Sequence, residues 1–278
     1  MNERRRLPLY EGERYQRLFQ RIRLDCAKCS GLCCAALFFS DIDGFPYEKP
    51  AAVPCLHLMK DFMCDTYADL AQNGWKGCCS YDCFGAGNYV TDSLYQGKTW
   101  RDDASMKQDI FAVFLIVYQL HQMLFYLCEA AMLANHRTYR HQIDRYINEI
   151  IALSESVDDL EKLDIEVLRG HINPLLKQAY LDIDPSMEKK KRFYHFNESL
   201  QHQKLCYEDF SMSFLIGSDL SGSELYGACF LGTDVRDVKV MDCDLTNCIY
   251  LTQGQLNTMI GNQHTRLPWF LKRPAHWK

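Results

Sequence analysis

The sequence predicts an α+β protein with three unlike parts: a cysteine-rich, metal-bound N-terminal region, a helical bundle and a C-terminal β-solenoid. Nine of the fourteen cysteines fall between positions 26 and 83, a density that packing alone does not explain. Apolar residues at helical spacing follow in residues 105–183. A five-residue period then runs from 205 to 250, and fixed short periods are typical of solenoids.

Composition and charge limit the classes of protein that fit. The chain has 278 residues, of which 47% are hydrophobic, and a net charge of −5, so we expect a globular protein without a general affinity for nucleic acid. No apolar stretch follows the arginines of residues 1–8, so no export signal is expected and a cytoplasmic location is predicted. Stable disulfides are rare in that reducing compartment, which favours metal binding by the cysteines. Residues 111–118 are the most apolar, but polar residues follow them, so a buried helix is expected and no membrane span.

The spacing of the cysteines in residues 1–104 indicates a metal site. Two residues between Cys26 and Cys29 let both sulfurs turn to one tetrahedral ion. Cys33 and Cys34 are adjacent, so their side chains tend to diverge, and they either serve different metals or include one bridging thiolate. Eight thiolates suffice for two four-cysteine sites or for one cluster with supporting ligands. The predicted ligands are Cys26, Cys29, Cys33, Cys34, Cys55, Cys64, Cys78 and Cys83, with His57, Cys79 and His121 as weaker candidates.

Residues 105–183 are predicted to form an antiparallel helical bundle. Ser105 can cap a helix running to about residue 134, and further helices are expected over 139–153 and 158–181, the last one kinked or split at Pro174. His121 and Cys128 lie seven residues apart and hence on one face of the first helix. They fit a core histidine and a buried thiol better than an outer-shell pair at the metal.

A charged linker at 184–199 separates this bundle from the repeat region, 200–252, and a cap and tail fill 253–278. The apolar positions of the repeat are Leu205, Phe210, Leu215, Leu220, Leu225, Phe230, Val235, Val240, Leu245 and Tyr250. Small residues, among them Cys243 and Cys248, recur two positions before them and are expected in the core. Thr252 and Gln255 have the spacing of a capping box, so a short helix is expected after the repeat.

The run Ser218-Asp219-Leu220-Ser221-Gly222 resembles the A(D/N)LxG consensus of the bacterial pentapeptide-repeat family. This resemblance implies a right-handed, quadrilateral β-helix with one pentapeptide on each side. Ten repeats would make about two and a half coils, on the order of 12 Å at the usual strand spacing. Some members of that family imitate duplex DNA and bind topoisomerases, but so short a stack argues against that role.

The N-terminal region resembles a second family. The run from Cys26 to Cys34, then Pro54-Cys55-x-His57-Leu58, Cys64 and Cys78-x4-Cys83, is similar to the CxxCxxCC family of zinc- or iron-chelating proteins. Cys79 has no counterpart in that pattern. The resemblance implies metal binding and says little about a reaction.

Three hypotheses for the function follow. The first is a metal-binding protein that uses its repeat region as a scaffold or recognition surface for a protein or peptide partner. Zinc is the first candidate metal, but soft thiolates also suit iron, iron–sulfur clusters or copper. The second is a metalloenzyme with redox or peptide-modification chemistry, and the third is a topoisomerase-binding DNA mimic. The sequence does not determine whether there is catalysis or what the oligomeric state is.

Overall fold

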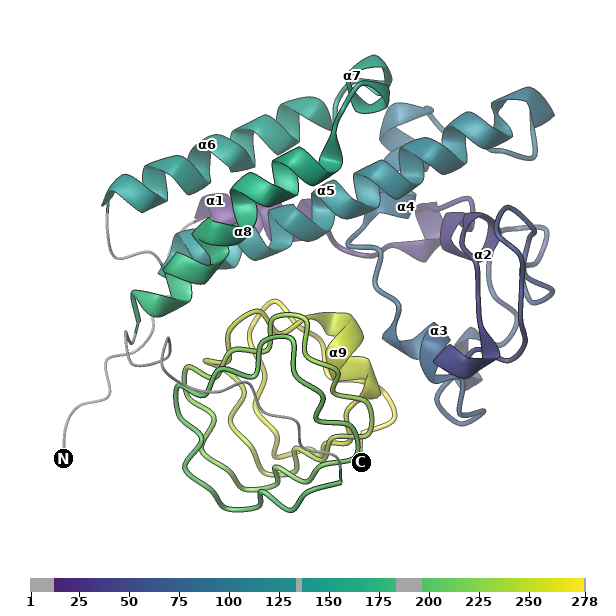
Figure 1. The fold of residues 1–278 in the computed structure, drawn as a ribbon. Coiled ribbons are helices and arrows are strands. Elements are labelled where there is room, and N and C mark those ends of the chain that lie inside the picture. The colour runs from purple at the N-terminus through teal and green to yellow at the C-terminus, as the bar shows by residue number, and fades with distance from the viewer. Residues whose placement is uncertain (1–12, 134–136, 184–196, 278) are drawn as a thin grey trace. The chain divides into compact units, whose positions relative to one another are not determined.

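The computed structural model describes residues 13–133, 137–183 and 197–277 (Figure 1). The chain divides into two compact units. The helical unit comprises 14–128 and 141–174, and the turn unit comprises 13, 129–133, 137–140, 175–183 and 197–277 of the described residues. The arginines near the N-terminus and most of the expected linker lie outside the described residues, so the predicted domain boundaries stay a prediction.

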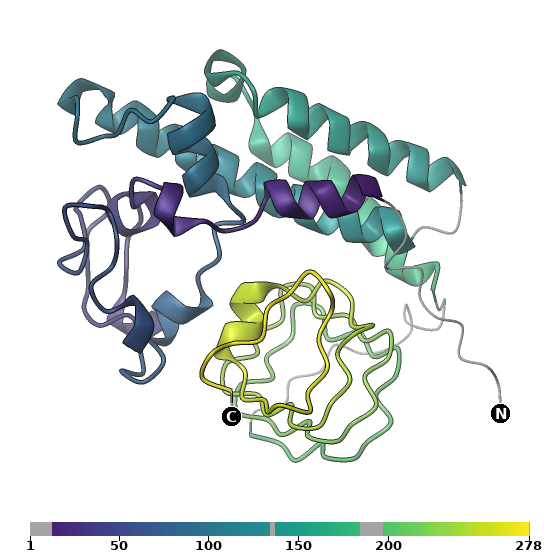
Figure 2. The same ribbon diagram turned by 180° about the vertical axis from the view of Figure 1, so that it is seen from behind.

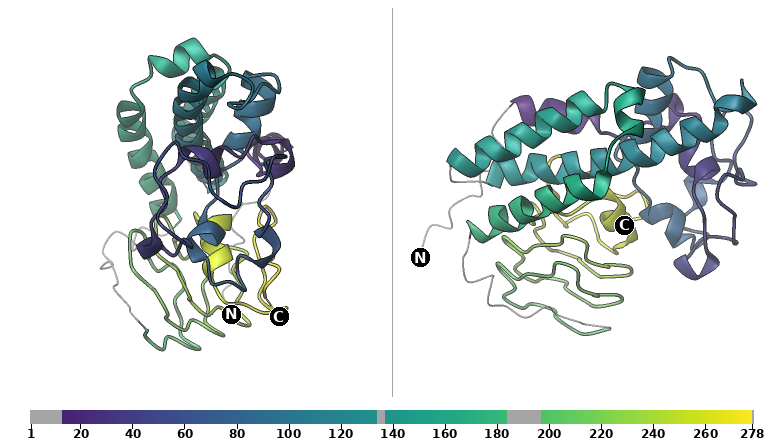
Figure 3. Two further views of the ribbon diagram at one scale, coloured as in Figure 1. Left: turned by 90° about the vertical axis from the view of Figure 1, so that its right-hand side faces the viewer. Right: turned by 45° about the horizontal axis from the view of Figure 1, so that its top comes forward.

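The helical unit packs long helices around an apolar core. They are α1 (Glu13–Arg21), α5 (Lys107–Leu133), α6 (Arg137–Leu153) and α8 (Ile165–Leu181); parts of α5, α6 and α8 belong to the turn unit. In α1 the side chains of Tyr15, Leu18 and Phe19 are buried, and Phe19 stacks edge-on against Phe125 of α5 at 5.4 Å between ring centroids. Tyr15 donates a hydrogen bond to Asp144 of α6 at 3.1 Å. Figure 3 shows α5, α6 and α8 side by side.

The predicted helices are confirmed with small corrections. The helix expected over 158–181 is two helices, α7 (Val157–Glu161) and α8, and Pro174 lies inside α8 without splitting it. Asp103, not Ser105, is the capping residue: it is the N-cap of the 3-10 turn Ala104–Met106 that leads into α5, and its carboxylate accepts from the Ser105 amide at 2.8 Å. By length and composition, residues 104–133 could cross a membrane, but 61% of their most apolar window is buried inside the protein, and a core helix passes the same test.

The cysteine-rich segment is made of short helices joined by loops, as Figure 2 shows. Its α-helices are α2 (Leu32–Ala36), α3 (Lys76–Ser80) and α4 (Ala86–Asn88). A 3-10 turn, η1 (Cys26–Lys28), precedes α2, and a π-helical turn, Tyr89–Leu94, follows α4. Single antiparallel bridges join Phe39 to Lys49 and Leu58 to Cys64. Backbone hydrogen bonds between loops therefore hold most of this segment together.

The turn unit is a stack of turns between residues 197 and 266 (Figure 1). Isolated parallel bridges join residues twenty positions apart, such as Ser199 with Asp219 and Lys204 with Glu224. The apolar residues of the five-residue period point inward and are buried, apart from Leu205, which is partly buried. The period thus correctly identified the core of this unit.

The predicted β-helix is nevertheless wrong, because none of the described residues lies in a β-strand. Left-handed backbone recurs at the same five-residue interval, with φ of 71° at Gly217 and 68° at Gly222. A left-handed residue ends any extended run, so each bridge stays a single residue long and no sheet forms. The fold is helical and turn-rich rather than α+β with a quadrilateral β-helix.

Helix α9 (Gln253–Thr258) closes the described elements and has the predicted capping box. The Thr252 hydroxyl accepts from the Gln255 amide at 3.2 Å, and Gln255 Oε1 accepts from the Thr252 amide at 2.9 Å. Gln255 Nε2 also donates to the carbonyl oxygens of Phe230 and Thr233. The Gln255 side chain therefore accepts a hydrogen bond from the backbone amide at the start of α9 and links the helix to the stacked turns.

Candidate metal centre

Cys26, Cys29 and Cys83 are brought together by contacts between η1 and α4. The Asp25 amide donates to Asn88 Oδ1 at 3.2 Å, and the Ser30 amide donates to Thr91 Oγ1 at 3.0 Å. Gly87 of α4 lies directly against two of the thiols. A Cβ atom at this position would be 2.6 Å from Cys29 Sγ and 3.9 Å from Cys83 Sγ, so only glycine leaves room for the cysteine side chains.

Helix α2 carries the adjacent pair Cys33 and Cys34. It starts at Gly31, whose φ of 67° puts the chain in left-handed backbone before the first turn. The two Sγ atoms are 3.8 Å apart. The hydrogen bond between them raises the pKa of Cys33 and lowers that of Cys34, so Cys34 is the first of the pair to ionise.

Cys55 and Cys64 lie at the two ends of a short hairpin-like loop. The Cys55 amide donates to the Cys34 carbonyl at 2.9 Å, which places this loop against α2. The Leu58–Cys64 bridge and the bond from the Asp65 amide to the His57 carbonyl at 3.0 Å close the loop. The Tyr47 hydroxyl is 3.1 Å from Cys55 Sγ.

Cys78 and Cys83 complete the predicted ligands. Cys78 lies on α3, and the residue before that helix, Trp75, contacts the ring of His57 at 5.0 Å between centroids. Burial raises the pKa of both Cys78 and Cys83 to about 12, and the charges of neighbouring cysteines add to the shift. Loss of water around the half-buried carboxyl of Asp82 raises its pKa to about 6. Without a metal the thiols of Cys78 and Cys83 are therefore protonated at neutral pH.

Lys49 is a buried lysine of this region, only 2% exposed. Its ammonium donates to the carbonyl oxygens of Leu37 at 2.5 Å, Val53 at 2.6 Å and Pro50 at 3.1 Å. It also stands 4.7 Å above the ring of Phe39. The charge of Lys49 lowers the pKa of Cys34, after the larger effect of the Cys33 hydrogen bond, so the lysine favours a thiolate there.

The donor chemistry fits a soft metal, but the thiols are not arranged as ligands. All fourteen cysteines are free thiols, and the eight predicted ligands come from five short stretches of the chain. Among the residues that the structure describes, no three His, Cys, Asp or Glu side chains are placed closely enough to hold one ion as they stand. The predicted ligand set therefore stays a prediction, and binding would need the thiols to turn toward a common centre.

The weaker candidates have other contacts. His57 Nδ1 is 2.9 Å from Asp65 Oδ1, and both side chains are partly exposed. His121 is buried, its Nδ1 donates to the Phe84 carbonyl at 2.8 Å, and burial lowers its pKa to about 4. It is thus a neutral core histidine, and Cys128 is likewise fully buried. Cys79 stays a partly exposed neighbour of Cys78 on α3.

The cysteines of the turn unit belong to its packing. Cys243 and Cys248 are buried in the apolar core, and the Cys243 thiol donates to the Leu220 carbonyl at 3.1 Å. Burial raises the pKa of Cys229 strongly. Cys243 and Cys248 are small core side chains, as their inward positions predicted.

Sequence reasoning missed Lys49, Tyr47 and Gly87. Lys49 and Tyr47 lie in loops, where no periodic pattern of side chains predicts their position. They come close to the cysteines only when the chain folds. Gly87 could have been singled out, because glycine is the usual residue where the backbone approaches another group closely.

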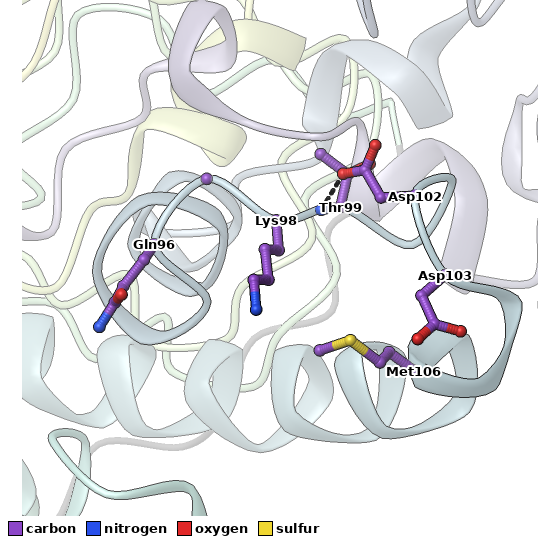
Figure 4. A pocket seen from close by; sticks show the side chains of 7 residues that line it. Gln96, Lys98, Thr99, Asp102, Asp103 and Met106 are labelled. Carbon is purple, nitrogen blue, oxygen red and sulfur yellow. Dashed lines mark hydrogen bonds between the residues drawn. The ribbon is translucent and has the colours of Figure 1, made fainter.

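A cavity of about 460 Å³ lies at the loop before α5, and none of the predicted ligands lines it. Figure 4 shows that Lys98, Asp102 and Asp103 contribute to its walls. Asp102 accepts from the Thr99 amide at 2.7 Å, and Asp103 caps the turn that leads into α5. The acidic side chains here are explained by local hydrogen bonding.

The fold and the site define a class: a helical protein with a thiol-rich loop segment and a separate stack of turns. Over 276 aligned residues the chain is 34% identical to the uncharacterized protein YybG of Bacillus subtilis (strain 168), with 91% of this chain and 94% of YybG covered. The chain belongs to the family of YybG. No protein-family model matches the chain, and no solved structure matches it. The assignment to the pentapeptide-repeat and CxxCxxCC families is therefore corrected, since no family model supports either and the turn unit has no strands in its described part.

Proposed function

We propose that this protein binds a metal through the thiolates of its cysteine-rich segment, with zinc as the first candidate. The observation that carries the proposal is that thiols from separate stretches of the chain lie within range of one another's charge: Cys34, Cys55 and Cys64 all act on Cys78. The buried Lys49 acts on Cys34 in the same region. Thiols that carry no metal gain little from being gathered in this way, because each charge raises the pKa of the next. A divalent cation removes that repulsion and binds thiolates strongly.

Metal would also supply order that the segment does not obtain from packing. Between residues 40 and 82 only Lys49 and Gly77 are classed as fully buried, whereas the long helices bury many apolar side chains. Short segments without an apolar core are commonly held by metal–ligand bonds. A reducing compartment, where the thiols stay available, is part of this proposal.

The test is the metal content of the purified full-length chain. We expect protein made in zinc-supplemented medium and purified without chelators to contain at least about one zinc per chain by elemental analysis. A variant with Cys26, Cys29, Cys55 and Cys64 changed to serine should contain almost none, whereas Cys206→Ser in the turn unit should match the unchanged protein. Metal well below one per chain in the unchanged protein, with its thiols shown to be reduced, would refute the proposal.

An absorption spectrum of an anaerobic sample identifies the class of metal. Zinc–thiolate protein is colourless above the ultraviolet, whereas an iron–sulfur cluster is brown because sulfur-to-iron charge transfer absorbs visible light. We expect a colourless preparation.

A further inference from the structure

The hydroxyl group of Tyr47 lies between a backbone amide and a cysteine sulfur. The Leu56 amide donates to the Tyr47 oxygen at 2.7 Å, and the same oxygen is 3.1 Å from Cys55 Sγ. A phenol has one proton to donate, and the oxygen of this one already accepts a hydrogen bond. In a metal complex the Cys55 sulfur has lost its proton and can only accept. The Tyr47 hydroxyl is then the donor in its contact with Cys55.

A second donor reaches the same sulfur. The His57 amide donates to Cys55 Sγ at 3.4 Å. The Leu58 amide donates to the Cys55 carbonyl at 3.1 Å, so the backbone makes a tight turn directly after this cysteine. The Cys55 amide in turn donates to the Cys34 carbonyl at 2.9 Å. Hydrogen bonds therefore hold both the backbone and the side chain of Cys55, and the fold fixes the direction of its sulfur.

The segment that carries Tyr47 is also held in place. Phe39 and Lys49 exchange backbone hydrogen bonds at 3.0 and 2.9 Å, which fixes the chain just after Tyr47. The Lys49 ammonium donates to the Val53 carbonyl at 2.6 Å, so it also holds the chain just before Cys55. The contact between the hydroxyl and the sulfur is therefore built by two segments that are tied to each other.

We infer that Tyr47 is a positioning residue of the proposed metal centre, where its hydroxyl donates to the Cys55 thiolate and strengthens metal binding. The inference rests on the proposed function and adds the residue that holds one of its ligands. A hydrogen bond donated to a ligand sulfur stabilises the negative charge that the sulfur carries. It also fixes the side chain before the metal arrives, so less conformational freedom is lost on binding.

The variant Tyr47→Phe tests the inference, because it removes the hydroxyl and keeps the ring. We expect the full-length chain to bind the same number of zinc ions but about 10–100-fold more weakly, measured by competition with a chelator of known affinity. Leu56 is 83% exposed, so water replaces the hydroxyl at its amide and the fold is kept. Tyr95→Phe changes a partly buried tyrosine outside residues 26–83 and is the matched control, which should bind zinc as the unchanged protein does.

The outcomes separate the inference from the proposed function. Equal zinc affinity of Tyr47→Phe and the unchanged protein would overturn the inference and leave the proposed function intact. No metal in the unchanged protein would refute the proposed function itself.

A double-mutant cycle distinguishes the hydrogen bond from a general structural role of Tyr47. In the Cys55→Ala background the sulfur is absent, so the addition of Tyr47→Phe should change the zinc affinity by less than about twofold. The same large loss in both backgrounds would show that Tyr47 acts through the fold and would overturn the inference.

The absorption of the cobalt-loaded protein gives a readout of the sulfur itself. Co²⁺ bound to thiolates absorbs in the near ultraviolet through charge transfer from sulfur to metal. A hydrogen bond lowers the energy of the sulfur electrons, so its loss in Tyr47→Phe should move this band to longer wavelength. Tyr95→Phe should leave the band in place. An unmoved band in metal-loaded Tyr47→Phe would show that the hydroxyl does not contact a ligand sulfur and would overturn the inference.

Discussion

At the scale of single residues, Glu129 is a carboxyl group buried inside the turn unit. It lies near the end of α5, its side chain is 0% exposed, and Oε2 accepts from the Tyr250 amide at 2.7 Å. Within the described part of the chain Oε1 has no hydrogen-bond partner. Burial raises the pKa of Glu129 well above 4.5, so the folded protein holds a proton there that the unfolded chain releases.

This difference predicts a pH dependence of stability. Above the unfolded pKa the native state binds more protons than the unfolded state, so the free energy of unfolding falls as pH rises toward the folded pKa. The slope from this one group is about 1.4 kcal/mol per pH unit. Glu129→Gln is neutral at every pH and should lose that slope, so its advantage over the unchanged protein grows between pH 5 and pH 7.

Urea unfolding at several pH values measures this effect. Glu149→Gln, on the exposed face of α6, is the matched control and should run parallel to the unchanged protein. A constant difference between Glu129→Gln and the unchanged protein across this range would show that Glu129 has an ordinary pKa.

At the scale of single elements, α4 shows how a very short helix positions two thiols. It has three residues, and its middle residue, Gly87, is buried against Cys29 and Cys83. A three-residue helix has no stability of its own. Its place is set by the bonds from Asp25 to Asn88 and from Ser30 to Thr91. The positions of Cys29 and Cys83 therefore depend on the close approach of the α4 backbone.

Gly87→Ala is expected to destabilise the helical unit by about 1–3 kcal/mol, because the new methyl group would overlap Cys29 Sγ. Gly170→Ala is the matched control in α8, where a Cβ meets nothing within 4 Å. It should stabilise the protein by up to about 1 kcal/mol, because alanine favours a helix more than glycine does. Urea unfolding of both variants is the measurement. Equal stability of the two variants would show that Gly87 is not required by close packing.

At the scale of the whole molecule, the two units differ in the interactions that stabilise them. The turn unit has a continuous apolar core, from Phe210 to Trp277, and repeated backbone hydrogen bonds between stacked turns. The cysteine-rich part of the helical unit has loops, few buried apolar side chains and many thiols. Metal removal should therefore affect one unit and spare the other.

Hydrogen exchange of the protein with and without a strong chelator, followed in individual peptides, tests whether metal removal affects only the cysteine-rich segment. Peptides covering 26–83 should lose amide protection when the metal is removed, because the ligand bonds that order their loops are lost. Peptides covering 205–250 should keep theirs, since their core holds no proposed ligand. Equal loss of protection in both regions would contradict an independent core for the turn unit.

The sequence by itself determined the features that depend on local periodicity. The long helices, the inward residues of the five-residue period and the Thr252–Gln255 capping box follow from side-chain spacing along one segment. The sequence also singled out the cysteines, since their density needs no folding to be seen.

Tertiary structure alone decided the rest. Left-handed residues at every fifth position keep the parallel bridges to single residues, so the repeat forms stacked turns without strands. The burial of Lys49 and the hydrogen bond from the Cys55 amide to the Cys34 carbonyl depend on contacts between distant segments. Spacing along the chain does not specify such contacts, because the positions of loop residues are set by hydrogen bonds that form only when the whole unit folds.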